Sequence, residues 1–217
     1  MVGRPDRRGN NGRGEGGAAE GRGDDAPPAR RGPAVLFVGG ALWYSERDRE
    51  GGRVRTSSDV HNYLLEQGVA HEIVHLPALS STARRNADLL GVPLREVLKT
   101  VLFETERGPV VCLVRGDARI DHARVCTEFG CASVTAVVAA RVVSLTGYRP
   151  RSLPPCGLAS DLPVVADAAI FELPVVYCGG GSATTMVKLR SAELRDALGV
   201  RVAAIAQRLQ NGAVARG

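Results

Sequence analysis

The sequence has few aromatic side chains and no long apolar run. Aromatic residues make up 4% of the 217 residues, whereas 44% are hydrophobic, so valine, leucine and alanine must fill most of any core. No apolar stretch approaches the roughly 18 residues that a membrane-spanning helix needs. The Gly/Arg-rich beginning of the chain is not followed by an apolar stretch, which argues against a secretory signal peptide. We therefore expect a cytoplasmic protein with no membrane partner.

Cysteines at metal-binding or disulfide spacing are also missing. The five cysteines are an odd number and none belongs to a C-x-x-C pair, so the sequence suggests neither a zinc ribbon nor a disulfide framework. Most of them stand in apolar surroundings, which is typical of reduced, buried thiols. The cysteines are Cys112, Cys126, Cys131, Cys156 and Cys178.

The excess of positive charge is small, with a net charge of +5 and a pI of about 9.2. This is compatible with a nucleic-acid partner but does not identify one. Residues 1–33 are rich in glycine and charge and have no aromatic side chain, so we expect them to be disordered. We expect an N-terminal extension over 34–55 and one domain over 56–217.

Helix and strand patterns alternate irregularly from residue 57 onward. We expect helices over 57–68, 80–91, 93–98, 121–130, 135–147, 191–199 and 201–210. We expect strands over 71–77, 99–106, 108–116, 162–167, 173–178 and 186–189, with a glycine-rich turn over 179–185. A hairpin in the middle of the chain, without strict β-α-β alternation, indicates an α+β fold with a mixed, largely antiparallel sheet.

Two motifs match known patterns only in part. The segment HEIVH, 71–75, fits the zinc-protease pattern, but that pattern requires a helix, and the flanking Gly68 and Pro77 favour a strand. On a strand its two histidines would be roughly 13 Å apart, too far to share an ion. The segment GGGSA, 179–183, matches neither a Walker loop nor a nucleophile elbow. It is either a tight turn or a backbone surface that a ligand approaches closely.

Lys99 is one of only two lysines among 28 basic residues and stands inside an apolar run. If 99–104 is a strand, Lys99 shares a face with Val101 and Phe103. A buried ammonium needs a partner or a function, and arginine cannot replace it because the guanidinium is larger and planar. The alternative is that the long side chain reaches solvent at the first residue of the strand. The residues alone leave both interpretations open.

Several segments in order resemble the YbaK/prolyl-tRNA-synthetase-associated domain family. They are VLKTVLF, VVCLVRGD, LTGYRP followed by PPCG, PVVADAAI and VYCGGG, and the match runs from about Ser57 to Leu198. The resemblance implies an α+β fold with a barrel-like sheet surrounded by helices. It also implies hydrolysis of the ester of a mischarged tRNA, typically tRNA for proline that carries a small non-cognate amino acid. It implies no metal, no cofactor and no covalent nucleophile.

The resemblance also implies the residues of the site. The catalytic candidates are Lys99 and Thr100. We expect contacts with the substrate or tRNA from Arg115, Gly147, Tyr148, Arg151, Pro155, Gly157, Asp167, Gly179, Gly180 and Gly181. The expected partner is the 3′ acceptor end of an aminoacyl-tRNA, and the resemblance also allows an aminoacyl-tRNA synthetase.

The loop that corresponds to 147–157 departs from the family pattern. Arg151 and Ser152 stand where the family has two glycines, which allow a close backbone approach or a positive φ. Arg151 narrows that space and adds a charge, which can contact a tRNA phosphate or weaken catalysis. The alternative function is therefore a tRNA- or nucleotide-binding protein of the same fold that has lost turnover.

Overall fold

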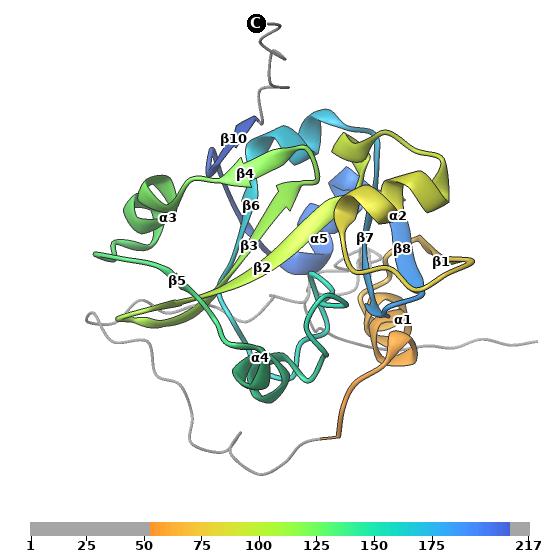
Figure 1. Cartoon of the computed structure of the whole chain (residues 1–217), viewed down its shortest axis with the longest axis horizontal. Helices are drawn as coiled ribbons and strands as arrows, with labels where there is room; N and C mark the ends of the chain where they lie inside the picture. Colours follow the sequence, from red (N-terminus) through yellow and green to blue (C-terminus); the bar gives the residue numbers. More distant parts are fainter. Residues whose placement is uncertain (1–52, 209–217) are drawn as a thin grey trace, which may run out of the picture. The chain divides into compact units, whose positions relative to one another are not determined.

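The computed structural model describes residues 53–208, and it shows an α+β fold in which strands far apart in the sequence pair with one another (Figure 1). The expected tail 1–33 and most of the expected extension 34–55 lie outside the described residues. Within 53–208, no helix is long and apolar enough to cross a membrane.

The helices begin and end largely where the cap residues predict. The α-helices are α1 (Ser57–Glu66), α2 (Ala83–Leu90), α3 (His122–Phe129), α4 (Ala139–Thr146) and α5 (Ser191–Leu198), with the short 3₁₀ helices η2 (Leu94–Glu96) and η3 (Ala168–Glu172). The Thr56 and Asp59 side chains form a capping box at the start of α1. Asp121 accepts hydrogen bonds from the first backbone N–H groups of α3, and Gly130 ends that helix in the left-handed conformation.

The strands form three sheets. They are β1 (His71–His75), β2 (Leu98–Thr105), β3 (Gly108–Arg115), β4 (Ala118–Ile120), β5 (Thr135–Ala136), β6 (Val164–Asp167), β7 (Val175–Ser182), β8 (Thr185–Arg190), β9 (Arg201–Ala203) and β10 (Ala206–Arg208). The sheet orders are β5-β2-β3-β6-β9, β1-β8-β7 and β10-β4. Only the β3–β6 and β6–β9 pairs are parallel among these described strands, so the sheet is largely antiparallel, as predicted.

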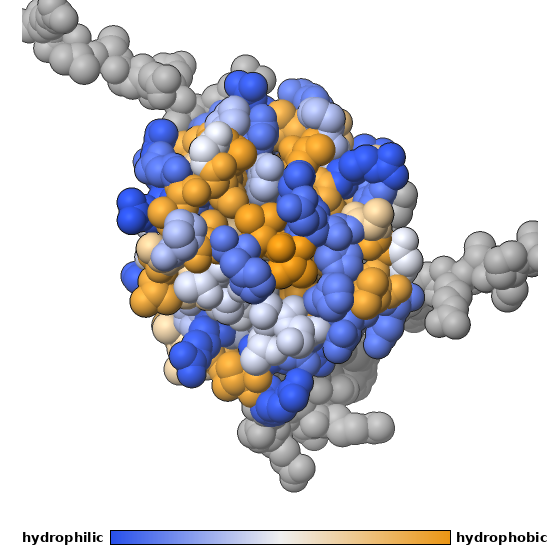
Figure 2. Space-filling model, turned by 90° about the vertical axis from the view of Figure 1, so that its right-hand side faces the viewer, coloured by the Kyte–Doolittle hydropathy of each residue, from blue (hydrophilic) through white to orange (hydrophobic). Residues whose placement is uncertain are grey.

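Strand β2 separates two parts of the hydrophobic core because its side chains alternate between its faces. Leu98 and Leu102 belong to a large cluster shared with α1, β7 and β8. Val101 and Phe103 pack in a second cluster with β3 and α3. A third, smaller cluster lies at α2, β1 and β8. Figure 2 shows the side of the molecule that lies to the right in Figure 1, where apolar residues occur near the centre and toward the upper and left edges, among hydrophilic ones.

Four expectations about the elements were wrong. No terminal helix covers 201–208, which instead forms β9 and β10, paired with β6 and β4. The helix expected over 135–147 begins only at Ala139, because Thr135 and Ala136 pair with β2. The helix expected over 93–98 is a single 3₁₀ turn, because β2 already begins at Leu98. The glycines expected in a turn lie inside β7, and the chain reverses after them.

Candidate active site

Lys99 is half-buried on β2, opposite Val114 of β3 and on the same face as Val101 and Phe103. Its ammonium group donates a hydrogen bond to the carbonyl oxygen of Ala118 in β4. Burial lowers the pKa of Lys99, and the nearby Asp117 carboxylate opposes this change. The side chain is therefore held in place by the protein and does not extend freely into solvent.

Thr100 points to the other face of β2, toward the cluster that contains Leu98 and Leu102. Its hydroxyl oxygen is buried and has no hydrogen-bond partner in the part of the chain that the structure describes. A buried hydroxyl without a partner costs free energy, so this position is less well satisfied than most buried polar groups. Lys99 and Thr100 are neighbours in sequence but contact different parts of the molecule.

The loop that follows α4 uses its polar groups for internal hydrogen bonds. Tyr148 is fully buried, and its hydroxyl donates to the carbonyl oxygen of Gly157 at 3.0 Å. The Arg55 guanidinium donates to the same carbonyl at 2.9 Å, and the Arg55 backbone N–H donates to Gly147 at 2.7 Å. Burial raises the pKa of Tyr148 to about 12, so its hydroxyl stays protonated. Pro155 is buried in the same loop.

Arg151 has a positive φ of 71°, and it is the one non-glycine residue with this conformation within 53–208. The sequence comparison with the family expects glycine here, and the backbone does adopt the conformation that favours glycine. The side chain is exposed. The guanidinium therefore does not fill the interior of the loop.

The three glycines of β7 allow the protein's own backbone to approach closely. A Cβ atom at Gly179 would collide with the carbonyl oxygen of Leu153. A Cβ atom at Gly180 would lie 2.8 Å from the backbone carbonyl oxygen of Thr185, and one at Gly181 would lie 2.9 Å from the backbone carbonyl oxygen of Thr56. The close approach predicted for these glycines is thus made by other segments of the chain.

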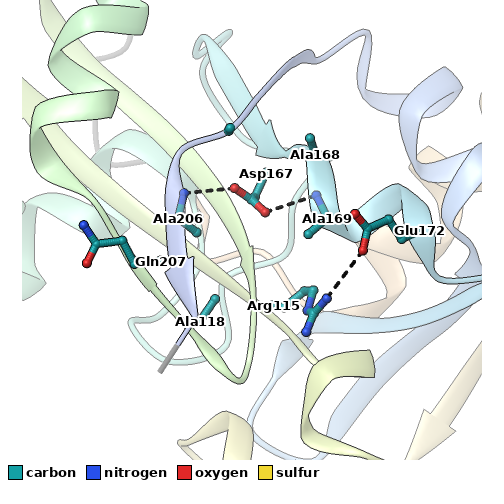
Figure 3. Close-up of a pocket in the computed structure, with 9 residues that line it drawn as sticks. Arg115, Ala118, Asp167, Ala168, Ala169, Glu172, Ala206 and Gln207 are labelled. Atoms are coloured by element: carbon teal, nitrogen blue, oxygen red, sulfur yellow. Dashed lines mark hydrogen bonds and ion pairs between the residues drawn. The ribbon is translucent and has the colours of Figure 1, made fainter. Parts of the chain in front are cut away.

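Arg115 and Asp167 meet at a cavity of about 230 Å³ (Figure 3). The Arg115 side chain is 7% exposed and forms two hydrogen bonds with Asp117, at 3.0 and 2.6 Å. Asp167 accepts hydrogen bonds from the backbone N–H groups of Ala169, Ile205 and Ala206. The cavity is lined by Arg115, Ala118, Asp167, Ala168, Ala169, Glu172, Ala204, Ala206 and Gln207.

Eight of the twelve expected site residues fall into two groups. Lys99, Arg115 and Asp167 meet around Ala118, which both accepts the Lys99 hydrogen bond and lines the cavity; we call them the Ala118 group. The second, called the Tyr148 group, gathers the 147–157 loop and β7, and consists of Gly147, Tyr148, Pro155, Gly157 and Gly181. The Lys99 side chain lies on the face of β2 opposite the cluster that contains Tyr148, so the two groups are on different sides of this strand.

The remaining polar motifs are the histidines of β1 and the five cysteines. His71 and His75 lie on β1, as predicted, and His71 is hydrogen-bonded to His61 at 2.8 Å. Within 53–208 there is no group of three His, Cys, Asp or Glu side chains that could hold a metal ion. All five cysteines are free, and burial raises the pKa of Cys112 and Cys156 to about 12, which disfavours their reactive thiolates.

The family model of the aminoacyl-tRNA editing domain matches residues 79–197, more than half of the chain. The chain belongs to the aminoacyl-tRNA editing domain family. The matched region contains both catalytic candidates and every expected contact residue, including Arg151 at the unusual loop position.

Relatives of this editing-domain protein include much longer chains. It is 28% identical over 144 residues to a proline--tRNA ligase of Exiguobacterium sibiricum. The aligned region covers 65% of this chain and 25% of the ligase. It is 25% identical to the uncharacterized protein YwhH of Bacillus subtilis, covering 63% of this chain and 87% of YwhH. The chain thus spans about a quarter of the length of the ligase but most of YwhH.

Solved structures show the same fold in chains of similar extent. One, proposed to be a trans-editing enzyme for prolyl-tRNA synthetase, is 26% identical with a TM-score of 0.66, covering 70% of this chain and 96% of its own. Another, the hypothetical protein APE2540, is 27% identical with a TM-score of 0.65, covering 69% of this chain and 99% of its own. These structures confirm the predicted editing-domain fold.

Sequence reasoning did not identify Arg119 and Glu172, two charged residues beside the Ala118 group. Arg119 is exposed and near enough to Lys99 to lower the pKa of the ammonium group. Glu172 lines the cavity and stands 4.0 Å from the Arg115 guanidinium. In the sequence, these two residues stood out only by their position, since each of them follows shortly after the end of a predicted strand.

Proposed function

We propose that this protein is a trans-acting aminoacyl-tRNA deacylase, which hydrolyses the ester between a tRNA and a wrongly attached amino acid. The observation that carries the proposal is the half-buried Lys99 ammonium within the region that matches the editing-domain family. The similarity to proline--tRNA ligases and to a structure proposed as a trans-editing enzyme supports tRNA for proline as the substrate. A cytoplasmic location, where aminoacyl-tRNA is used, is part of the proposal.

Lys99 would hold the 3′ end of the tRNA through the terminal phosphate or the carbonyl oxygen of the ester. Its ammonium group already has a fixed position, so little reorganisation is needed when negative charge develops on the ester oxygen. Arg119 adds a second positive charge nearby, and Asp117 keeps the local charge moderate. Together these groups can attract a phosphate and orient the ester.

Water is the nucleophile in this proposal. The buried cysteines have raised pKa values, and an aminoacyl ester is already activated toward hydrolysis. A neighbouring ribose hydroxyl of the substrate can assist the water. Thr100 faces away from Lys99, so we assign it a positioning role within β2 and assign the substrate contact to Lys99.

The experiment compares the two lysines of the matched region. Lys188 lies on β8, has a side chain that is 39% exposed, and pairs with Glu72 at 2.8 Å, so Lys188→Ala is a matched control for Lys99→Ala. Both variants are assayed for release of alanine, cysteine and proline from tRNA for proline. We expect Lys99→Ala to lower the rate by about 100–1,000-fold, the usual effect of losing one preorganised donor. Lys188→Ala should keep the parental rate.

A Lys99→Ala protein that folds and deacylates at the parental rate would refute the assigned role. The second candidate function, a tRNA-binding protein without turnover, is favoured by Arg151 at the position where the family has glycine. It predicts binding of the tRNA panel without release of any amino acid. The same assay, combined with a binding measurement, therefore separates the two functions.

A further inference from the structure

The cavity beside η3 combines small apolar walls with charged groups of both signs. Its lining includes the methyl groups of five alanines, contributed by β4, η3 and the β9–β10 segment. Arg115, Asp167 and Glu172 supply the charges, and Figure 3 shows them around the opening. A volume of about 230 Å³ is large enough for one small organic molecule.

Arg115 directs an unused donor into this cavity. A guanidinium group has five N–H donors. Asp117 accepts hydrogen bonds from Nε and Nη2, whereas Nη1 has no hydrogen-bond acceptor in the described part of the chain. The side chain is more than nine-tenths buried, and Arg115 is one of the residues that line the cavity.

The two carboxylates of the cavity differ in how they are used. Both oxygens of Asp167 accept hydrogen bonds from backbone N–H groups. Glu172 is 65% exposed and accepts no hydrogen bond within 53–208, and its nearest charged neighbour is Arg115 Nη1 at 4.0 Å. The cavity thus presents a guanidinium nitrogen and a carboxylate that are ion-paired with each other at 4.0 Å but make no hydrogen bond in the described part of the chain.

We propose that this cavity binds a small zwitterion, a free α-amino acid. Its carboxylate would accept hydrogen bonds from Arg115 Nη1, its ammonium group would contact Glu172, and its side chain would pack on the alanines. A simple anion would face the carboxylates of Asp117, Asp167 and Glu172, and a simple cation would face Arg115. Only a ligand with both charges can supply a hydrogen-bond acceptor to Arg115 and a cationic donor to Glu172, and the alanine walls select a small side chain.

This site shares Ala118 with the proposed tRNA contact at Lys99, but binding of a free amino acid does not depend on deacylation. A free amino acid is nevertheless the product that hydrolysis of an aminoacyl ester releases. Binding is measured on the full chain without tRNA, so a failure of this inference and a failure of the proposed function are distinguishable.

The test is calorimetric titration with glycine, alanine and proline, and with the half-ligands acetate and methylammonium. For so small a ligand we expect a dissociation constant on the order of 1 mM for at least one amino acid. Each half-ligand should bind at least about tenfold more weakly, since each satisfies only one of the two charged groups.

Variants locate the site. Glu172→Gln removes the exposed carboxylate with little risk to the fold, and we expect about tenfold weaker binding of the amino acid. Glu72→Gln is the matched control, since Glu72 is 62% exposed and also ion-paired, but lies on β1 away from the cavity. Ala168→Leu places a larger side chain at an exposed lining position and should abolish binding.

Four results would overturn the inference. The first two are equal affinity for acetate and alanine, and equal affinity for methylammonium and alanine. The third is unchanged binding in both Glu172→Gln and Ala168→Leu. The fourth is no heat of binding for any amino acid at about 100 mM, a concentration at which a ligand with a millimolar dissociation constant would saturate the site.

Discussion

The Ala118 group and the Tyr148 group were both expected to contact the substrate, yet the fold treats them differently. In the Ala118 group, Lys99 and Arg115 are charged, partly or largely buried, and adjacent to a cavity or to exposed charge. In the Tyr148 group, the tyrosine hydroxyl and the carbonyls of Gly147 and Gly157 bond to groups of the same loop or to Arg55.

This difference separates residues that can act on a ligand from residues that shape the loop. A polar atom that already has an internal partner must lose that partner before it can bind a substrate. Arg115 Nη1 has a long ion pair with Glu172 but no hydrogen bond to lose, Arg119 is exposed, and Lys99 has further donor hydrogens beyond the one bonded to Ala118. A resemblance to a family identifies both kinds of residue with equal strength, and only the hydrogen bonds tell them apart.

The largest expected effect on stability is at Tyr148. Tyr148→Ala should lower the free energy of unfolding by about 3–5 kcal/mol, because it removes a fully buried aromatic ring. Tyr148→Phe should cost only about 1 kcal/mol, since the Gly157 carbonyl keeps its hydrogen bond from Arg55. Urea unfolding measures both values. Should Tyr148→Phe keep its stability but lose deacylation, the hydroxyl contacts the substrate and the contrast between the two groups fails.

A smaller loss is expected for Gly179→Ala, because the new methyl group would overlap the Leu153 carbonyl and push the loop away from β7. We expect a cost of about 1–3 kcal/mol, typical of overpacking. Gly68→Ala is the control: it also introduces a side chain, with a φ of 68°, but it has no atom within 4 Å of the new Cβ. Thermal unfolding of both variants compares the cost of the steric collision at Gly179 with the cost of backbone strain alone at Gly68. If Gly179→Ala is as stable as the parent yet fails to deacylate, the glycine faces a ligand after all.

Local signals predicted much of this fold, and distant contacts decided the rest. The cap residues at Thr56 and Asp121 act within a few residues, so α1 and α3 begin where the sequence indicates. The segment 201–208 has an apolar pattern that resembles a helix. Its conformation is fixed instead by Asp167, which accepts hydrogen bonds from Ile205 and Ala206 and which the pattern cannot reveal.

The site was predictable to a similar degree. The rarity of lysine and the alternation of β2 identified Lys99 and the apolar face that it shares with Phe103. The sequence could not show that Thr100 and Lys99 serve different parts of the molecule, because that depends on which sheet packs on each face of β2. It also could not show that Glu172 would stand beside Arg115, since the two residues meet only through tertiary packing.

Arg119 offers a modest test of the Ala118 group as a tRNA contact. It is exposed and forms no ion pair with another described residue, so it can bind a phosphate without losing an internal partner. Arg119→Ala should reduce the slope of log binding constant against log salt concentration by about 0.9, the value for one phosphate contact on duplex nucleic acid. Arg190→Ala is the control, because Arg190 is already paired with Glu193. Equal slopes for both variants would place the phosphate elsewhere.

The smallest expected effect is at Arg151, where the chain departs from its family. A non-glycine residue in the left-handed conformation costs about 1–2 kcal/mol of strain, which glycine relieves. Glycine also makes the unfolded chain more flexible, and this entropy offsets about 0.5–1 kcal/mol of the gain. Arg151→Gly should therefore raise the free energy of unfolding by about 0.5–1 kcal/mol. Arg149→Gly, at an exposed arginine two residues earlier without a positive φ, should lower it instead. Denaturant midpoints measure the pair.

The same variant decides whether the arginine affects turnover. Because the Arg151 guanidinium is exposed and does not fill the loop, we expect Arg151→Gly to deacylate at the parental rate. A large gain in rate with unchanged tRNA binding would mean that Arg151 suppresses catalysis. The parental protein, with Arg151 in place, would then bind tRNA without turnover. The Tyr148 group, rather than the Ala118 group, would control release of the amino acid.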